Sequence, residues 1–384
     1  MRNDYRSVYV AFDPHPSYKG ASTHIHHMCD VLAGAHPTLL LLTLKSNQPP
    51  IWTEHIHQYC FESEEENILK RATAFMRWTK SILDQQYNLV VGHFRDTWGG
   101  MAVLEFPHIR PLFEVNGLPS VELPYRYPYI AGETLQKILR MEERCLTKAT
   151  AVITPSHTTK ACLMLRGVEE EKITVIPNGA EVPEKVLLRP ADLPEKYMVY
   201  VGALQPWQGV DVLLRALRYL QDLPVPLVIC SSYTEHHAKP YIKFAEKIGV
   251  SDKVIWRYQL DKPALNSVLT HALFSVAPLT ECSRNLEQGC SPLKILESMA
   301  CGTPVIASQI PVVSEIISHD EDGILCRADR PAELSRTMRI AMDYPERTRQ
   351  LGEQARRKIQ QQFTWSHAHR TLQQVYDNVL TFSF

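Results

Sequence analysis

The sequence predicts an α/β protein built on two doubly wound parallel sheets. Short apolar segments rich in β-branched residues alternate with longer amphipathic segments along most of the 384 residues, which is typical of strand–helix units with parallel strands. A hydrophobic fraction of 45% over this length can fill at least two cores. Prolines and charges interrupt any period over residues 181–196. We therefore expect two similar domains with a ligand-binding cleft between the carboxyl ends of their strands.

The expected strands are continuous apolar runs, as buried parallel strands are. In the first half they lie at residues 8–12, 38–44, 89–93, 111–115, 151–154 and 173–177, with helices at 21–33, 67–83, 135–147 and 158–166. In the second half, strands are expected at 198–202, 227–230, 254–257, 273–277, 304–307 and 324–326. Residues 332–380 are polar and helical in pattern, so we expect them to pack across the back of the domains. The predicted units are an N-terminal domain over 1–183, a C-terminal domain over 184–362 and a closing helix over 363–384.

Charge and cysteine content exclude several classes of protein. The 41 basic and 42 acidic side chains give a net charge of -1, so no surplus is available for binding a nucleic-acid backbone. The nine cysteines are scattered and form no CxxC pair, which argues against a zinc knuckle or a redox dithiol and fits a reducing compartment. No apolar segment is long enough for a signal peptide or a membrane span. We expect a cytoplasmic protein.

The most informative segment runs from Ser291 to Ser308. Ser291 is a good N-cap and Pro292 a good first residue of a helix that begins there. A lysine in the first turn, Lys294, opposes the helix dipole unless an anion binds the exposed amides. Glu297 follows on the same helical face. A phosphate on Lys294 and a hydroxylated group on Glu297 describe a nucleotide ribose diphosphate; the alternative is that Lys294 reaches water and Glu297 is surface charge.

This segment resembles the donor-binding helix of retaining glycosyltransferases of family 4. These have the GT-B fold, two Rossmann-like domains that face each other across a cleft. Four further segments match in order and spacing: AVITPS at 151–156, IPNGAE at 176–181, YVGALQPWQGVD at 200–211 and FTW at 363–365. The resemblance covers nearly the whole chain, more firmly after residue 150.

The resemblance implies roles for the residues of the helix. Glu297 would hydrogen-bond the ribose hydroxyls of a sugar nucleotide, and Lys294 with the amides of Pro292 and Leu293 would bind its diphosphate. The acceptor would attack from the leaving-group face with help from a phosphate oxygen. No metal and no cofactor are implied. Family frequency makes UDP-glucose or a close relative the expected donor.

Three positions depart from the family pattern. Gly289 stands where a second glutamate usually holds the donor sugar, and either Glu287 or the amides of Gly289, Cys290 and Ser291 could replace that carboxylate. Gln208 replaces the usual phosphate-binding lysine of the loop that contains Gly202 and Trp207, and no arginine stands upstream of it there, so fewer cations would hold the diphosphate. The segment Glu114-Val115-Asn116-Gly117 replaces a His-Gly pair, and Asn116 could hydrogen-bond a sugar hydroxyl.

Other candidates have an ordinary structural alternative. The loop before Gly20 would face the diphosphate and the acceptor in the family, or it is a plain strand–helix turn. Arg95 and Asp96 are either acceptor contacts or a structural ion pair. Tyr258 lies where the family binds the nucleobase, or it is packing at a strand end. His24 and His27 share a helical face, but no carboxylate or cysteine completes a metal-ligand set.

Residues 68–83 predict an amphipathic helix with four basic residues beside its apolar stripe. Such a helix can lie on an anionic membrane surface, at the inner face of the plasma membrane in this case. The alternative is a helix that packs its apolar face on the core.

The sequence therefore predicts a retaining, metal-independent glycosyltransferase that moves a hexose from a nucleotide-diphosphate sugar to a saccharide or lipid-linked acceptor, in polysaccharide or glycolipid biosynthesis. A sugar-nucleotide epimerase of the same fold and a non-enzymatic sugar-binding protein with two domains are the alternatives. A nicotinamide dehydrogenase is disfavoured because no GxGxxG opens either half.

Overall fold

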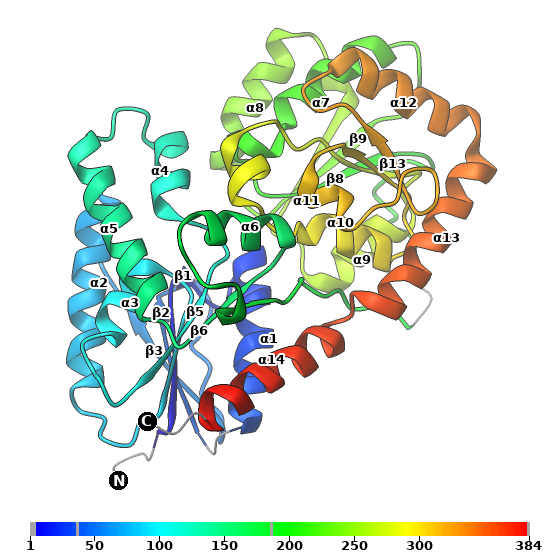
Figure 1. Cartoon of the computed structure of the whole chain (residues 1–384). Helices are drawn as coiled ribbons and strands as arrows, with labels where there is room; N and C mark the ends of the chain where they lie inside the picture. Colours follow the sequence, from blue (N-terminus) through cyan, green and yellow to red (C-terminus); the bar gives the residue numbers. More distant parts are fainter. Residues whose placement is uncertain (1–4, 36–37, 185–186, 382–384) are drawn as a thin grey trace.

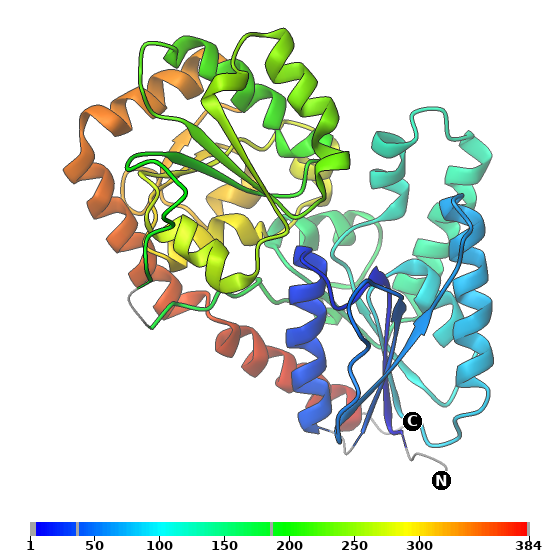
Figure 2. The same ribbon diagram turned by 180° about the vertical axis from the view of Figure 1, so that it is seen from behind.

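The computed structural model describes residues 5–35, 38–184 and 187–381. Two parallel sheets confirm the predicted fold class (Figures 1 and 2). Seven strands form the first sheet in the order β3-β2-β1-β4-β5-β6-β7, and six form the second in the order β10-β9-β8-β11-β12-β13. The residues beside the predicted boundary at 183/184 include 185–186, which lie outside the described residues, so the domain limits stay a prediction.

The first sheet is built within residues 7–175. Its strands are β1 (Ser7–Pro14), β2 (Leu39–Leu44), β3 (Ile56–Phe61), β4 (Val91–Phe94), β5 (Arg110–Glu114), β6 (Ala151–Thr154) and β7 (Ile173–Val175). The connecting helices are α1 (Gly20–Ala35), α2 (Ile68–Leu83), α3 (Thr97–Val103), α4 (Pro119–Arg126), α5 (Gly132–Lys148) and α6 (His157–Leu165).

The second sheet is built within residues 198–326. Its strands are β8 (Met198–Gly202), β9 (Leu227–Ser231), β10 (Val254–Tyr258), β11 (Ser275–Ala277), β12 (Val305–Ser308) and β13 (Ile324–Cys326). The helices are α7 (Val210–Leu217), α8 (Glu235–Lys247), α9 (Lys262–Thr270), α10 (Leu293–Ala300) and α11 (Pro311–Ser314), and a π-helical turn spans Arg284–Gln288. Three helices close the chain: α12 (Pro331–Asp343), α13 (Pro345–Gln362) and α14 (Trp365–Thr381).

Strand β3 is the one strand of the first sheet that the sequence did not predict. It pairs with β2 along its full length at the edge of the sheet. Its sequence, IHQYCF, mixes polar and apolar residues, and only two of its side chains are buried. An edge strand does not need a continuous apolar run, because one of its sides is free of the core.

The last helix, α14, returns to the first half of the molecule. Figures 1 and 2 show it beside α1, against which it packs. Its buried side chains recur at helical spacing, as an amphipathic helix requires, and they are Trp365, Ala368, Leu372, Val375, Tyr376 and Val379. They join the core under α1.

Helix α2 packs its apolar stripe on the core, as the alternative interpretation expected, so contact of residues 68–83 with a membrane stays a prediction. Asn67 caps it by accepting hydrogen bonds from the amides of Leu69 and Lys70. Ala72, Phe75 and Leu83 are buried in the core of the first sheet. The apolar stripe is therefore buried inside the protein, and the exposed side of the helix carries the charged residues. None of the described helices is both long and apolar enough to cross a bilayer.

Candidate functional site

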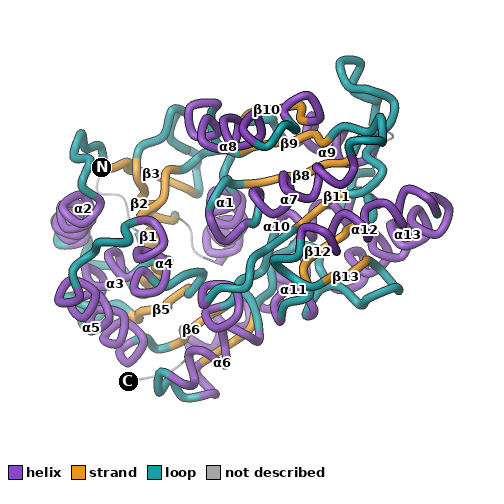
Figure 3. The backbone as a smooth tube through the Cα atoms, turned by 90° about the horizontal axis from the view of Figure 1, so that it is seen from above, coloured by secondary structure: helices purple, strands orange, loops and turns teal. Residues whose placement is uncertain are grey.

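A cleft of about 720 Å³ lies between the two halves. Figure 3 shows α1 between the two sheets with α10 beside it, and a Cβ placed on Gly20 would lie 3.0 Å from Leu293 Cδ1. The structure brings most of the sequence-predicted site residues to the wall of this cleft: Gly20, Arg95, Asn116, Gly202, Trp207, Gln208, Cys290, Ser291, Pro292, Leu293, Lys294 and Glu297. The ligand site at the carboxyl ends of parallel strands follows the usual rule for such sheets.

Helix α10 begins one residue later than predicted. Pro292 is its N-cap, and no side chain caps it. Ser291 is not the cap, because its hydroxyl accepts a hydrogen bond from the Asn178 amide at 3.2 Å. Pro292 has no amide hydrogen, so it cannot donate to a phosphate as expected. The amides at the start of the helix that lack intrahelical partners are those of Leu293 and Lys294.

Lys294 is almost fully buried, with an exposed fraction of 9%. Its Nζ donates to Tyr200 Oη at 2.8 Å and lies 4.1 Å from the centre of that ring. Tyr200 Oη in turn donates to the Ala203 carbonyl oxygen at 2.7 Å, so it is free to accept from the lysine. No carboxylate pairs with Lys294 among the described residues. Burial is the main cause that lowers the pKa of Lys294 to about 7; Arg284 nearby acts in the same direction, and Cys290 and Glu297 act against it.

This lysine should make donor binding dependent on pH. Below about pH 7 Lys294 carries its proton, and above it the free protein must take up a proton to hold an anion. The affinity for UDP-glucose, whose diphosphate does not titrate in this range, should fall by up to about 10-fold per pH unit above the pKa. Calorimetry in two buffers that differ in ionisation enthalpy measures both the affinity and the proton uptake. An affinity that stays constant from about pH 6 to about pH 9 would contradict the assignment.

Glu297 lies one turn further along α10 and also faces the cleft. Its Oε1 is 2.6 Å from Lys262 Nζ, and its exposed fraction is 13%. Lys262 is the first residue of α9, after the N-cap Asp261. Lys262 was not among the site residues predicted from the sequence; the signal that could have found it is a charged residue just beyond the carboxyl end of strand β10.

Further cations line the cleft from both halves. The expectation of fewer cations considered only the loop of Gln208, and these cations come from other segments of the chain. Lys19 Nζ lies 5.2 Å from the centre of the Tyr233 ring. The guanidinium carbons of Arg126 and Arg284 lie 5.8 Å and 5.3 Å from the Trp207 ring centre. All three cations line the same cleft, although they are distant in sequence.

Arg284 is held by the first half of the chain. Its Nε lies 3.3 Å from Glu122 Oε1 of α4, and Tyr125 Oη of the same helix is 2.8 Å from Ser283 Oγ. Gln288 accepts a hydrogen bond from the amide of Leu118 at 2.9 Å. The π-helical turn is therefore tied to α4, which fixes the width of the cleft at this end.

Gly289 does not face the cleft. Its φ is +82°, and a Cβ there would meet Thr159 Oγ1 at 2.7 Å and Ser156 Oγ at 2.9 Å at the start of α6. Its amide donates to the Arg284 carbonyl oxygen at 3.0 Å, so it is not available to a donor sugar. Glu287 also lies outside the cleft wall. The Gly289 amide therefore cannot replace a sugar-binding carboxylate in this arrangement, and Glu287 does not reach the wall, whereas Cys290 and Ser291 do line the cleft, so replacement by their amides stays a prediction.

Tyr258 is likewise outside the cleft wall. Its ring stacks on that of Trp256, with 6.4 Å between centres. The residues that follow it, Leu260, Asp261 and Lys262, do line the cleft. The residue predicted to contact the nucleobase, Tyr258, is therefore not part of the cleft wall, which begins two residues later in the sequence at Leu260.

The wall opposite α10 comes from the first half. Arg95 and Asn116 line it, as predicted, while Glu114 is buried behind them with an exposed fraction of 2%. Asp96 caps α3 by accepting from the Gly99 amide, so it is structural. Among the described residues, no group of three or more His, Cys, Asp or Glu side chains is arranged to hold a metal ion.

Two family descriptions together span most of the chain. "Glycosyltransferase Family 4" matches residues 18–182, and "Glycosyl transferases group 1" matches residues 189–358. The chain belongs to glycosyltransferase family 4. The recognition made from the Ser291–Ser308 segment is thereby confirmed.

Curated proteins resemble parts of the chain. A D-inositol 3-phosphate glycosyltransferase of Jonesia denitrificans is 27% identical over 271 residues, which are 65% of this chain and 62% of the relative. An MMP alpha-(1->4)-mannosyltransferase of Mycolicibacterium hassiacum is 26% identical over 251 residues, 63% of this chain and 57% of the relative. The chain thus matches somewhat more than half the length of these relatives.

Solved structures show the same GT-B fold over nearly the full chain. Sucrose-phosphate synthase of Thermosynechococcus elongatus superposes with a TM-score of 0.80 at 20% identity, covering 99% of this chain and 100% of that one. HepE of Anabaena in complex with UDP-glucose gives 0.74 at 14% identity and covers 97% and 100%. WaaG, a glycosyltransferase involved in lipopolysaccharide biosynthesis, gives 0.75 at 13% and covers 98% and 100%.

Proposed function

We propose that this family 4 protein is a retaining glycosyltransferase that transfers a hexose from a nucleotide-diphosphate sugar, with UDP-glucose or a close relative as donor, to a hydroxyl of a saccharide or lipid-linked acceptor. The observation that carries the proposal is Lys294, a buried cation without a carboxylate partner among the described residues, at the amide end of α10 in the cleft. A buried charge is costly unless something pairs with it. A donor diphosphate supplies that partner.

The names of similar proteins support the choice of substrates. The HepE structure holds UDP-glucose, and the curated relatives are named a D-inositol 3-phosphate glycosyltransferase and an MMP alpha-(1->4)-mannosyltransferase. One of these proteins is seen with a nucleotide sugar, and the other two are named as glycosyl-transferring enzymes, which agrees with the proposed donor and reaction.

The chemistry follows from the charges at the wall. As the bond between the anomeric carbon and the diphosphate breaks, negative charge grows on the diphosphate, and Lys294 with the α10 amides stabilises it. The described carboxylates of the cleft wall are all engaged with protein groups: Asp13 with Arg95, Asp96 and Asp261 with helix amides, Glu122 with Arg284, and Glu297 with Lys262. This favours transfer in which the acceptor proton passes to a diphosphate oxygen of the donor, with no protein carboxylate as base.

Nucleotide titration tests the proposal. Calorimetry with UDP, GDP and ADP should show binding of one nucleotide, UDP by preference. Glu297→Gln should weaken it by about 10-fold, since a hydrogen bond from a ribose hydroxyl to a carboxylate is worth roughly 1.5 kcal/mol. Glu353→Gln, on the exposed face of α13, is the matched control and should bind normally.

Failure to bind any of the three nucleotides contradicts the donor site. Incubation with UDP-glucose in the absence of an acceptor should give slow hydrolysis; formation of an epimeric sugar would instead indicate an epimerase.

A further inference from the structure

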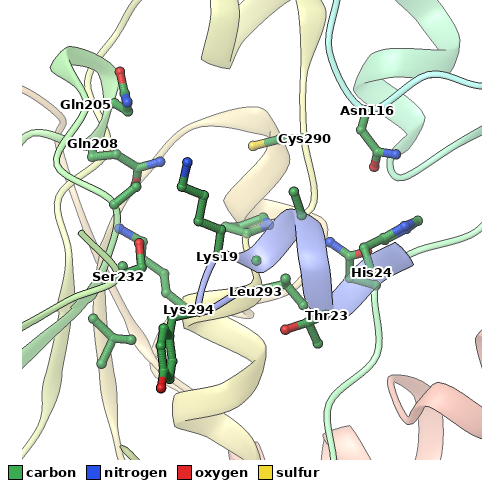
Figure 4. A pocket seen from close by; sticks show the side chains of 18 of the residues that line it. Lys19, Thr23, His24, Asn116, Gln205, Gln208, Ser232, Cys290, Leu293 and Lys294 are labelled. Atoms are coloured by element: carbon green, nitrogen blue, oxygen red, sulfur yellow. The ribbon is translucent and has the colours of Figure 1, made fainter. Parts of the chain in front are cut away.

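One lysine side chain contacts the second half of the chain from across the cleft. Lys19 directly precedes α1, and Tyr233 lies two residues after strand β9. The Nζ atom of Lys19 lies 5.2 Å from the centre of the Tyr233 ring, and both residues line the cleft wall. Figure 4 shows Lys19 in the middle of the pocket, with Gln208 on one side and Asn116 on the other. The contact therefore crosses space that a ligand of the cleft would use.

The Tyr233 ring is fixed by its own half of the chain. Its hydroxyl accepts a hydrogen bond from Gln205 Nε2 at 2.7 Å, and its backbone amide donates to Ser231 Oγ at 3.0 Å. The ring also stacks on His237, with 5.0 Å between the ring centres. The position of this ring therefore does not depend on Lys19.

Lys19 is fixed at its backbone and not at its ammonium group. Its amide donates to Ser17 Oγ at 3.4 Å, and its carbonyl oxygen accepts from the Ser22 amide at 2.9 Å. No carboxylate pairs with Nζ among residues 5–35, 38–184 and 187–381. A lysine head group sits on a flexible four-carbon stem. The contact with Tyr233 can therefore break through rotation of one side chain, without movement of the backbone.

A second bridge between the halves lies further along the cleft. Lys19 follows β1 and Tyr233 follows β9, whereas α4 follows β5 and the π-helical turn follows β11, two strands further along each sheet. That bridge contains the ion pair of Glu122 with Arg284 and the hydrogen bonds of α4 to the turn described above. Several polar bonds hold more strongly than one cation–π contact. A ligand entering the cleft would therefore break the Lys19 contact first.

We propose that Tyr233 holds Lys19 across the cleft in the unliganded protein, and that the diphosphate of a nucleotide sugar draws the lysine off the ring. Phosphate oxygens accept charge-assisted hydrogen bonds from an ammonium group, which a neutral ring cannot match. The contact is thus a gate that is closed without donor and that the donor opens. This inference rests on the proposed function, because it takes the anion to be a donor diphosphate.

The gate predicts that removal of the ring strengthens donor binding. The contact with Tyr233 reduces the fraction of protein in which Lys19 is available, and the apparent affinity falls in proportion. A cation–π contact at a partly exposed site corresponds to a factor of about 3 in an equilibrium constant. Tyr233→Leu should therefore raise the affinity for UDP about 3-fold in calorimetry. Inorganic pyrophosphate, which has no base to stack on a ring, should gain by the same factor.

A double-mutant cycle separates the gate from a direct contact of the tyrosine with the nucleotide. Lys19→Met should weaken UDP binding about 10-fold, because a charged hydrogen bond to phosphate is lost. In that background Tyr233→Leu should change the affinity by less than about 1.5-fold, since no cation is left to hold. Tyr233→Phe keeps the ring and should keep the gate. Tyr219→Leu is the matched control, because Tyr219 is exposed in the same half and lies outside the cleft wall.

NMR of protein labelled with carbon-13 lysine observes the gate directly. The ε-methylene signal of Lys19, assigned by its loss in Lys19→Met, should be shifted upfield by the tyrosine ring in the unliganded protein. Addition of UDP or pyrophosphate should move it downfield, and Tyr233→Leu should place it downfield without a ligand. If Tyr233→Leu does not fold, the response of the unmodified protein to the two anions decides.

Four results would overturn the gate. They are a UDP affinity of Tyr233→Leu that is equal to or below that of the unmodified protein, a gain that persists in the Lys19→Met background, a Lys19→Met protein that binds UDP normally, and a Lys19 signal that moves with neither anion. The proposed function fails in a different way. If pyrophosphate moves the Lys19 signal while UDP, GDP and ADP do not bind, the gate responds to an anion and the nucleotide donor is wrong.

Discussion

Replacing Lys294 by methionine is expected to weaken UDP binding by about 100-fold and to stabilise the unliganded protein at the same time. The loss of affinity follows because a charged hydrogen bond to a phosphate is worth roughly 1.5–3 kcal/mol. The gain in stability follows because the lysine is buried without a carboxylate partner among the described residues, and a methionine fills the same space without a charge.

The gain in stability should depend on pH with a definite sign. The pKa of Lys294 is lowered from 10.5 to about 7 in the folded protein. Below about pH 7 the native state contains a buried cation, which costs on the order of a few kcal/mol. As the pH rises from about 7 towards 10.5, that cost disappears, and the advantage of methionine disappears with it.

Chemical denaturation and calorimetry of the same preparations measure both effects. Lys253→Met is the control, because Lys253 donates to the Leu223 carbonyl away from the cleft. A Lys294→Met protein that binds UDP normally would show that the diphosphate lies elsewhere. Lower stability of this variant below about pH 7 would show that the lysine is a structural residue.

Replacing Gly209 by alanine should destabilise the protein by about 4 kcal/mol and abolish donor binding. Gly209 has a φ of +67°, and a Cβ there would lie 1.8 Å from the Pro278 carbonyl oxygen. The left-handed backbone alone costs roughly 1–2 kcal/mol in any residue with a Cβ, and the clash forces two backbone segments apart. The loop that carries Trp207 and Gln208 to the cleft would move with them.

Thermal and denaturant unfolding of Gly209→Ala give the size of the effect. Gly34→Ala is the comparison: it lies near the end of α1, and a Cβ there meets nothing within 4 Å. Alanine should stabilise that helix by roughly 0.5–1 kcal/mol. Equal stability of the two variants would mean that the chain adapts at Gly209 without cost.

The fold was largely predictable because most of its strands are apolar throughout. Both sheets bury their two faces under helices, so most strands appear as continuous hydrophobic runs, and strand β6 (Ala151–Thr154) has the predicted limits. Strand β3 was missed because edge position allows polar residues such as His57 and Gln58. Helix α2 shows the reverse case: its amphipathic pattern predicted the helix correctly, but the pattern is the same whether the apolar face meets a core or a membrane.

The candidate site was predictable where it is local in sequence. Lys294 and Glu297 share one helix, so their spacing places both on one face. Gly289 could not be placed in this way, because it lies in the turn before the helix and its direction depends on contact with α6.

The amino-acid sequence determined by itself the α/β class, the family and the lysine–glutamate pair of α10. The tertiary structure decided which other charges meet that pair. Lys19, Arg126, Lys262 and Arg284 are separated by long stretches of chain, and they converge only because two sheets dock with their carboxyl ends facing each other. Likewise, the direction in which the Asn116 side-chain amide points depends on Glu114. The other partners of Glu114 come from α1, β1, β4 and the residue directly after β4. Sequence periodicity reports which face of an element is apolar; it does not report which distant polar groups that element will meet.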